Sequence, residues 1–342
     1  MRSHSRSRGF SLIELMVGIV LALIAVIVIM QIFQQSEASK RTTTGTSSAA
    51  MDGALATVDL QRELRQAGAG LINTDMLGCS LQISSTFTLT NLAPVTINHS
   101  QVPAGDAGSD TLLVVYGTFN GSPDGDKVSA QAGQVLTVGA PSAYTINDYV
   151  IPTPLTRTTP CALQLFQATA VSGSGSSGSL TLSATPASLA ISPASIYDVG
   201  APHIVAYAVR NGRLTQCDFL QSNCTVAANY TELYDGVVNL RAVYGHGPSP
   251  LTYDQTTPTT AANWELVPLV RFALTLRSGQ LEKNAVTGAA PANCPNGCKA
   301  LPTWSEAGVA AINISGLTNW QYYRYFVFEA AVQLRNVANL SS

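Results

Sequence analysis

Residues 9–33 decide the fold, and they read GFSLIELMVGIVLALIAVIVIMQIF. From Phe10 onward the polar side chains in this stretch are those of Ser11, Glu14 and Gln31. As an α-helix with a rise of about 1.5 Å per residue, the 24 residues after Gly9 are about 36 Å long, which is enough to span the hydrocarbon core of a bilayer. The sequence therefore predicts a membrane-spanning helix near the N-terminus.

The nine residues before this span, MRSHSRSRG, are basic and polar. Their arginines favour the cytoplasmic side, so the chain after residue 35 is expected across the membrane. A secretory signal peptide or an ordinary single-span anchor is the alternative interpretation. A secretory signal, however, is cut after its apolar region in a small-residue context, and no Ala-x-Ala pattern follows residue 30 closely.

Glu14 is the second feature that argues against a plain anchor, because it places a carboxylate inside the apolar run. A charged side chain deep in a membrane helix costs about 2.5–3.5 kcal/mol on insertion scales. Such a residue is functional by default, and it needs a partner of opposite charge.

The string from Gly9 to Val17, GFSLIELMV, closely resembles the class III signal of type IV prepilins and of type II secretion pseudopilins. The resemblance implies that prepilin peptidase cleaves after Gly9 and methylates the new amino terminus at Phe10. It also assigns Glu14 to subunit assembly, where the carboxylate pairs with the positive N-terminus of a neighbouring subunit and relieves both buried charges. The basic leader before this motif and the membrane span after it make the motif specific.

The helix is expected to continue to about residue 70. Residues 51–67 carry two apolar stripes with helical spacing. One stripe consists of Met51, Leu55 and Val58, and the other of Leu60, Leu64, Ala67 and Leu71. Residues 42–48, TTTGTSS, are poor helix formers and predict a bend or soft joint in one long helix. Gly68 and Gly70 are expected to end it.

Beyond residue 78, short alternating runs predict β-strands. The earlier expected strands cover residues 110–116, 144–151, 163–171 and 180–182. The serine- and glycine-rich residues 172–179 predict a flexible loop between the last two.

Asn211-Gly212, between two apolar runs, predicts a β-hairpin over residues 203–217. Three later strands alternate clearly, with one side chain in two expected to face inward. The expected inner faces are Val238, Leu240, Ala242 and Tyr244; Leu266, Val270, Phe272, Leu274 and Leu276; and Phe326, Phe328, Ala330, Val332 and Leu334.

The C-terminal half resembles the PilW-type minor pilins. The segments that carry this resemblance are AYAVRNGRL (206–214), VVNLRAVYG (237–245) and YRYFVFEAAVQLRN (323–336). The resemblance implies an α+β, pilin-like fold, in which the long N-terminal helix packs on an antiparallel β-sheet domain with extended loops. The expected parts are a leader (1–9), a transmembrane or filament-core helix (10–35), the exported half of the helix (36–70) and a single β-rich globular domain (71–342).

The same resemblance implies a minor pilin that primes and supports type IV pilus assembly, at or near the filament tip. The implied partners are other minor pilins, the major pilin, prepilin peptidase, the inner-membrane assembly platform and, as a further candidate, a tip adhesin. The expected location is the inner membrane, with one span and a periplasmic C-terminus, and then the cell-surface pilus. A large pseudopilin of a type II secretion system and a filament-displayed adhesin, with its binding surface in residues 80–200, are the alternatives.

The composition agrees with an exported β-rich domain. Charged residues make up 11% of the 342 residues, against about 25% in an average soluble domain. The formal net charge is −2, and without the leader's three arginines the remaining 15 basic and 20 acidic residues give −5. Because Lys and Arg do not cluster after the leader, nucleic acid is not an expected partner.

Six cysteines in an exported chain predict disulfides. Local spacing favours the pair Cys217–Cys224 around a short polar loop and the pair Cys294–Cys298 around an Asn-Gly turn. Cys79 and Cys161 then pair by elimination, although sequence order alone does not prove any pairing. A zinc site formed by the last four cysteines is the alternative, but their spacing differs from the usual Cys-x-x-Cys knuckles.

Catalytic chemistry has little support in the sequence. The four histidines have no serine or carboxylate motif beside them, and nucleotide-binding signatures do not occur. No catalytic residue, cofactor or metal is therefore expected. Two acidic loops are weak candidates for calcium, one with Asp106 and Asp110 and the other with Asp124 and Asp126, although Asp-Gly pairs are also ordinary turn residues.

Overall fold

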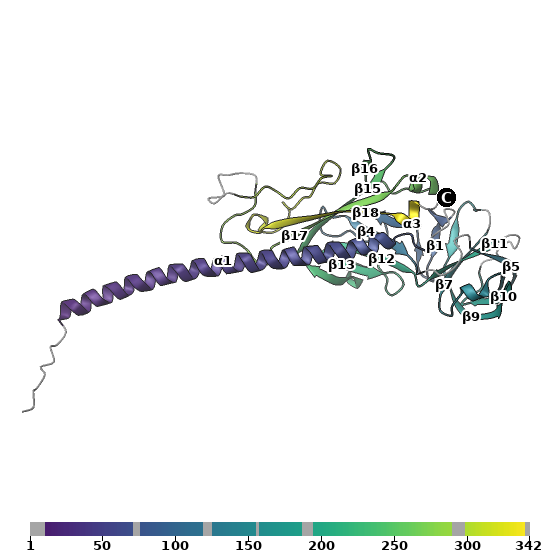
Figure 1. The fold of residues 1–342 in the computed structure, drawn as a ribbon, viewed down its shortest axis with the longest axis horizontal. Coiled ribbons are helices and arrows are strands. Elements are labelled where there is room, and N and C mark those ends of the chain that lie inside the picture. Colours follow the sequence, from purple (N-terminus) through teal and green to yellow (C-terminus); the bar gives the residue numbers. More distant parts are fainter. Residues whose placement is uncertain are drawn as a thin grey trace, which may run out of the picture.

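The structure is a computed structural model that describes residues 11–70, 76–118, 125–154, 157–186, 194–288 and 298–338. It has an α+β fold in which one long helix, α1 (Leu12–Gln66), runs into a domain of β-sheets (Figure 1). The helix has 55 residues, and its first half projects away from the domain.

The helix α1 is continuous through residues 42–48, where the sequence predicts a soft joint. The Thr43 hydroxyl donates to the Ser39 carbonyl at 2.9 Å, and the Thr46 hydroxyl donates to the Thr42 carbonyl at 2.8 Å. These bonds to the preceding turn satisfy the hydroxyl groups within the helix. Figure 1 shows a gentle curvature along α1 in place of a sharp kink.

The predicted end of the helix is confirmed. After Gln66 the chain leaves the helix, and Gly68 and Gly70 have left-handed φ angles of 82° and 75°, which glycine adopts without strain. The Gly68 N–H donates to the Val115 carbonyl at 2.9 Å, which ties the end of α1 to the sheet below it.

Two antiparallel sheets enclose the second half of α1 (Figure 1). The first has the strand order β16 (Thr252–Asp254), β15 (Val237–His246), β17 (Leu269–Arg277) and β18 (Tyr325–Gln333). The second has the order β14 (Thr231–Asp235), β13 (Arg213–Asp218), β12 (His203–Arg210), β4 (Thr111–Tyr116) and β3 (Val95–Ile97). Both sheets share one hydrophobic core with the helix.

The helix enters this core through its second predicted stripe. Leu60, Leu64 and Ala67 are no more than 2% exposed, and Ala56 on the same face is fully buried. Leu71 lies outside the described residues. Burying a leucine side chain contributes about 1.5–3 kcal/mol, so this stripe fixes the rotation of α1 against the sheets.

The Asn211-Gly212 hairpin is confirmed. β12 and β13 pair in continuous register up to Arg210 and Arg213, and the two turn residues have φ angles of 53° and 72°. Positive φ at both central positions is typical of the type I′ turn, whose twist matches that of the flanking strands.

The inner faces of β15, β17 and β18 are largely as predicted. The core contains the predicted Leu240, Ala242, Tyr244, Val270, Phe272, Leu274, Leu276, Ala330, Val332 and Leu334, and Phe328 packs against it. Val237 takes the place of Val238 in this core, because the register of β15 shifts between Val237 and Asn239. Leu266 is 55% exposed, since it follows the short helix α2 (Ala261–Glu265) and does not belong to β17.

A closed six-stranded barrel, which the sequence did not predict, forms between residues 126 and 200. Its strand order is β10 (Ser177–Leu182), β6 (Val135–Val138), β5 (Asp126–Ala132), β11 (Ala194–Gly200), β7 (Tyr149–Pro154) and β9 (Phe166–Ser174). Leu136, Val150 and Phe166 belong to its own core, separate from that around α1. The barrel lies at the end of the molecule opposite to the free end of α1 (Figure 1).

The prediction of a flexible loop over residues 172–179 is wrong, because these residues form the paired tip of the β9–β10 hairpin. The hydroxyl oxygens of Ser172 and Ser179 lie 2.7 Å apart across the two strands, and Gly175 at the turn has a φ of 75°. Serine and glycine suit a loop in isolation, but here the neighbouring strands of the barrel supply the hydrogen bonds that keep them extended.

Two other strand predictions have the wrong limits. The first, 144–151, begins only at Tyr149, after the short 3₁₀-helix η2 (Pro141–Ala143). The second, 163–171, is divided at Leu165 between β8 (Ala162–Gln164) and β9.

A small three-stranded sheet and a few short helices complete the fold. The sheet has the order β2 (Thr88–Leu89), β1 (Ser80–Gln82) and β8. The remaining helices are η3 (Ala227–Asn229), η5 (Trp320–Tyr322) and α3 (Arg335–Ala338).

Candidate assembly interface

The first half of α1 presents apolar side chains on every side. From Leu12 to Phe33 each large apolar side chain is 48–78% exposed. By length and composition α1 is able to cross a membrane, and no residue in its apolar part is buried. A helix that is apolar all round requires lipid or other helices around it, because the rest of the described chain does not cover it.

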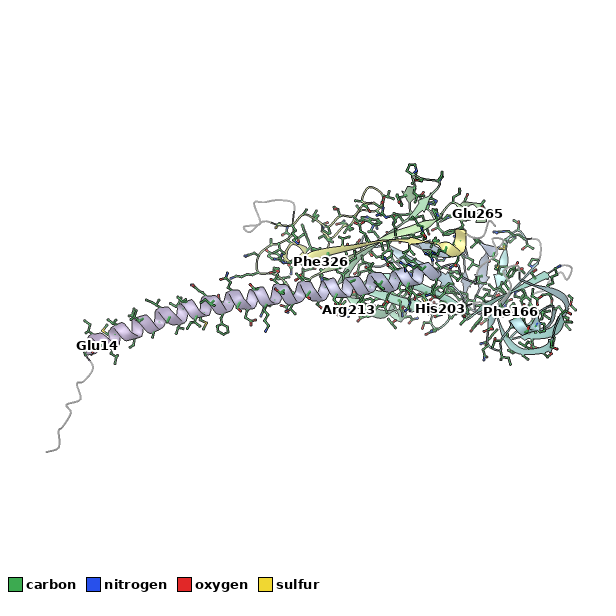
Figure 2. All side chains as sticks on the ribbon, in the orientation of Figure 1. Glu14, Phe166, His203, Arg213, Glu265 and Phe326 are labelled. Carbon is green, nitrogen blue, oxygen red and sulfur yellow. A yellow bond between two sulfur atoms is a disulfide. The ribbon has the colours of Figure 1, made fainter. Side chains whose placement is uncertain are left out.

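Glu14 lies in the first turn of this helix, at the tip farthest from the barrel residue Phe166 (Figure 2). Its Oε2 accepts a hydrogen bond from the Ser11 N–H at 3.2 Å, which forms a capping box at the start of α1. The free N–H groups and the helix dipole at this end favour a negative charge. The side chain is exposed, so its carboxylate can also accept a bond from outside the chain.

Gly9 and Phe10, the predicted cleavage and methylation positions, lie outside the described residues. The structure therefore places Glu14 next to the beginning of the described chain. The pairing of Glu14 with the positive N-terminus of another subunit stays a prediction.

The first predicted stripe of the exported half stays outside the domain. Met51, Leu55 and Val58 are 67%, 47% and 60% exposed, although residues on the opposite side of the same turns are buried. The apolar surface of the membrane segment is thus followed by a narrower apolar strip on the domain half of α1. A strip of this kind is available to a neighbouring helix.

A loop from the C-terminal half braces α1 at the point where the helix leaves its exposed segment. The Thr42 hydroxyl donates to the two carboxylate oxygens of Glu282 at 3.0 and 3.1 Å, and Arg324 Nε donates to Glu282 at 2.9 Å. Gly45 is buried against the backbone of Gly279. Sequence reasoning missed this brace, because Thr42 and Glu282 are 240 residues apart and neither belongs to a recognisable motif.

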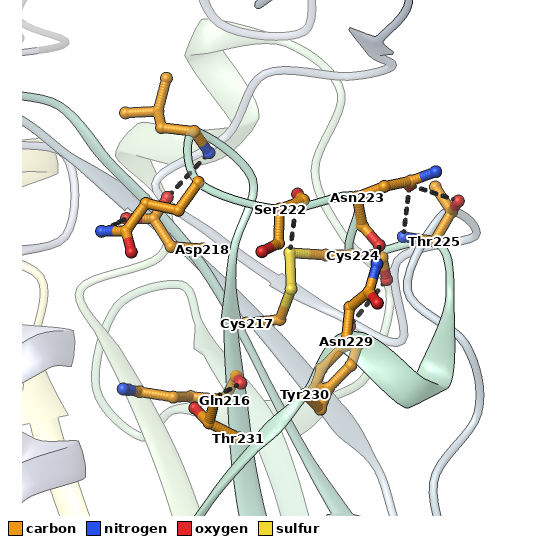
Figure 3. Close-up of a disulfide and its surroundings, with 12 residues drawn as sticks. Gln216, Cys217, Asp218, Ser222, Asn223, Cys224, Thr225, Asn229, Tyr230 and Thr231 are labelled. Atoms are coloured by element: carbon orange, nitrogen blue, oxygen red, sulfur yellow. Dashed lines mark hydrogen bonds between the residues drawn. A yellow bond between two sulfur atoms is a disulfide. The ribbon is translucent and has the colours of Figure 1, made fainter.

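Two of the three expected disulfides are confirmed. Cys79 bonds to Cys161 across 82 residues and connects the segment before β1 to the segment before β8. Cys217 bonds to Cys224 across seven residues, next to the end of β13 (Figure 3). Cys298 is also disulfide-bonded. Cys294, its expected partner, lies outside the described residues.

The acidic loops do not converge on a common point. Asp106 accepts hydrogen bonds from the N–H groups of Asn211 and Gly212 at 2.9 and 2.8 Å, so it caps the β12–β13 turn. Asp126 accepts from the N–H groups of residues 139 and 140 at 3.2 and 2.7 Å. These carboxylates are engaged by donors of the fold. Asp124 lies outside the described residues.

Asp110 is buried and belongs to a polar network. Its Oδ1 accepts from Arg241 Nη1 and from Asn98 Nδ2 at 2.9 Å each, and its Oδ2 accepts from Gln255 Nε2 at 2.7 Å. Its Oδ2 also accepts from the Ala242 N–H at 3.0 Å. The carboxylate thus ties β4 to β15, and its oxygens serve the fold. Among the described residues, no group of three or more His, Cys, Asp or Glu side chains has the geometry of a metal site.

The described histidines lie apart from one another, and each one contacts a different residue of the fold. His99 is buried, its Nε2 lies 2.8 Å from the Thr90 carbonyl oxygen, and burial lowers its pKa. The ring of His203 stacks on Tyr116 with centroids 4.7 Å apart. His246 Nε2 lies 3.0 Å from Asp254. The structure does not bring these rings into one arrangement.

Comparisons with known proteins identify two regions of the chain. The family model described as Type IV Pilus-assembly protein W matches residues 206–336, and the model described as Prokaryotic N-terminal methylation motif matches residues 4–30. The first range contains most of β12 and all of β13, β15, β17 and β18, and the second contains the motif around Glu14. No curated protein matches the chain. Among solved structures, a type IV-like pilin from Thermus thermophilus is similar at 13% identity, over 57% of this chain and 87% of that chain, with a TM-score of 0.25.

Proposed function

We propose that this chain, a prepilin-type protein of the PilW family, is a minor pilin that primes type IV pilus assembly and sits at or near the filament tip. The proposal rests on one observation about α1. Its exposed apolar half begins with the carboxylate of Glu14, and a folded domain is built around its other half. Its partners are other minor pilins and the major pilin.

The proposed assembly step is lateral. Prepilin peptidase first cleaves after Gly9 and methylates Phe10. The helix then lies in the inner membrane, with Glu14 near the cytoplasmic side. Glu14 then pairs with the amino terminus of a neighbouring subunit, which neutralises two charges that are costly in an apolar environment. The apolar surfaces of the two helices pack together as the subunits leave the bilayer.

The rigid connection between helix and domain supports this role. The core stripe fixes the rotation of α1, and the Glu282 brace holds the helix near Thr42. Once Glu14 sets the register of the helix, the position of the exported domain in the assembly follows from it.

A clean deletion strain tests the proposal. We expect loss of surface pili and of twitching, with type II secretion intact, and we expect both phenotypes to be restored by the wild-type chain. Complementation with Glu14→Gln should give a stable membrane protein that does not restore pili, because the neutral amide cannot compensate the partner's charge. Normal pili with failed secretion would assign the protein to the pseudopilin class instead.

A filament-displayed adhesin is the second candidate, and the position of the barrel favours it. The barrel lies at the end of the molecule opposite to the free end of α1 and has few charged residues on its strands (Figure 2). Lysine substitutions at the exposed Ser129 and Thr169 would then reduce adhesion to host cells while the number of pili stays normal. Unchanged adhesion in such a strain would remove this candidate.

A further inference from the structure

A polar groove lies between α1 and the second sheet, on the side of β12, β13 and β14. It has two parts with volumes of about 320 and 260 Å³. Arg62, Glu63, Tyr207 and Gln216 line both parts, so the two form one channel along the helix. We call this channel the helix–sheet groove.

The lining of the helix–sheet groove is acidic. Asp59 and Glu63 line it from α1, and Asp218 lines it from the end of β13. Arg62 is the one lysine or arginine among its described lining residues, and the side chain of Arg62 is 73% exposed at the rim. Its guanidinium comes only within 3.8 Å of Glu63, so the pair is loose.

Tyrosine hydroxyl groups hold two of these carboxylates in place. The Tyr116 hydroxyl donates to Glu63 Oε2 at 2.7 Å, and the Tyr234 hydroxyl donates to Asp59 Oδ2. Burial, and then the neighbouring Glu63, raise the pKa of Tyr116, so this hydroxyl remains a donor. Tyr207 also interacts with Glu63, so tyrosine side chains orient both carboxylates along the wall of the groove.

Asp218 lies in an environment that disfavours its charged form. Its oxygens accept from the Leu220 N–H at 2.9 Å and from Gln221 Nε2 at 3.4 Å, and His203, which lines the same part of the groove, partly offsets the cost of its charge. Burial raises the pKa of Asp218, which means that its charged form is destabilised in the fold. A cation placed beside Asp218 would relieve this cost.

The shape of the groove favours an extended ligand. β14 is an edge strand, and its residues Thr231, Leu233 and Tyr234 border the two parts of the groove. An edge strand has backbone N–H and C=O groups to which an extended segment can add. Ser222, in the loop closed by Cys217–Cys224, and Asn229 of η3 also line the groove with polar side chains (Figure 3).

We infer that the helix–sheet groove binds a basic, extended segment of another protein subunit, with a lysine or arginine side chain in the part lined by Glu63 and Asp218. Charge complementarity identifies the segment as basic, and the bordering edge strand identifies it as extended. The identification of that subunit as a pilus protein rests on the function proposed above. The binding of a basic segment is independent of that function.

The test measures binding of a labelled short peptide of alternating lysine and threonine to the full chain in detergent, by fluorescence polarisation. The double variant Glu63→Gln with Asp218→Asn should weaken binding by about tenfold or more, because two charged acceptors become neutral. Arg62→Gln should tighten binding severalfold, since it removes a competing guanidinium from the exposed rim. Glu265→Gln removes a charge from α2, away from the groove (Figure 2), and should leave the affinity unchanged.

Other outcomes would overturn the inference. Equal affinity of the parent chain and the double variant, with unchanged near-ultraviolet circular dichroism, would exclude the groove as the binding place. Equal binding of a peptide of alternating aspartate and threonine would exclude charge recognition. Competition by free arginine or spermidine at the affinity of the peptide would mark a small-cation site and exclude a docking surface. Because pilus formation is not a readout, a negative result here leaves the proposed function untouched.

Discussion

The ring of Phe328 on β18 lies directly against Gly53 of α1. A Cβ atom added to Gly53 would lie 2.2 Å from Cε2 of that ring, a distance at which something must shift. Because Gly53 has no side chain, the helix backbone lies close to the sheet at this position. Gly53 belongs to the half of α1 whose buried face fixes the helix rotation.

Gly53→Ala is expected to lower the stability of the domain. Alanine favours the helix by about 1 kcal/mol over glycine, but overpacking against the partly buried ring of Phe328 costs about 1–3 kcal/mol. We expect a net loss of about 1 kcal/mol and a lower Tm, measured by thermal unfolding of the full chain in detergent.

Gly45→Ala is the matched control for this effect. A Cβ atom at Gly45 would meet its nearest neighbour, the Gly279 nitrogen, at 3.6 Å, which is an ordinary contact. This variant should be neutral or more stable by about 0.5–1 kcal/mol. If both glycine variants were stabilised equally, the contact with Phe328 would have no energetic role.

The brace at Glu282 predicts a local effect on the helix. Glu282→Gln weakens the bonds to Thr42 and Arg324, and we expect a loss of about 1 kcal/mol for these partly buried, charge-assisted contacts. Amide hydrogen exchange should accelerate in residues 42–48, where helix propensity is poor. Exchange that rises uniformly over the domain, or not at all, would contradict a local brace.

The two described disulfides should differ in their contribution to stability. For loops of 82 and seven residues, loop-closure entropy gives about 4.5 and about 2.4 kcal/mol. The paired serine variant of Cys79 and Cys161 is therefore expected to lower the free energy of unfolding more than that of Cys217 and Cys224. Chemical denaturation of both variants measures the order, and the reverse order would show that strain or residual structure outweighs chain entropy.

Local patterns in the sequence predicted much of the fold around α1. The stripe of Leu60 and Leu64 and the Asn211-Gly212 turn carry their information within a few residues, since helical periodicity and positive φ are local properties. Glu14 was singled out by an equally local signal, because a carboxylate in an apolar run is anomalous wherever it occurs, and its role in assembly stays a prediction.

The barrel and the contacts between distant segments could not be predicted in this way. Ser172 and Ser179 lie in strands only because neighbouring strands pair with them, and their own residue types favour a loop. Glu63 meets Tyr116 across 53 residues, and Thr42 meets Glu282 across 240. Each partner is an ordinary residue on its own, so the helix–sheet groove and the brace arise only from the folded arrangement.

Asp218 links stability to the proposed binding. Burial raises its pKa above the ordinary value of 3.8, more than the nearby His203 lowers it, so the charged form is less favourable in the folded chain than in the unfolded one. The ionised carboxylate therefore lowers stability at neutral pH, and this cost disappears as the pH falls through the raised pKa toward 3.8.

Asp218→Asn should consequently raise Tm at neutral pH, and its advantage over the parent chain should shrink as the pH falls toward the ordinary carboxyl pKa. The amide oxygen can still accept from the Leu220 N–H, so the turn after β13 is preserved. The same variant is expected to bind the basic peptide more weakly, which would identify Asp218 as a residue that costs stability for the sake of recognition. Thermal unfolding of parent and variant over a pH series measures this, with Glu265→Gln as the control for removal of a surface carboxylate. An advantage that does not change with pH would show that the effect does not come from ionisation of Asp218.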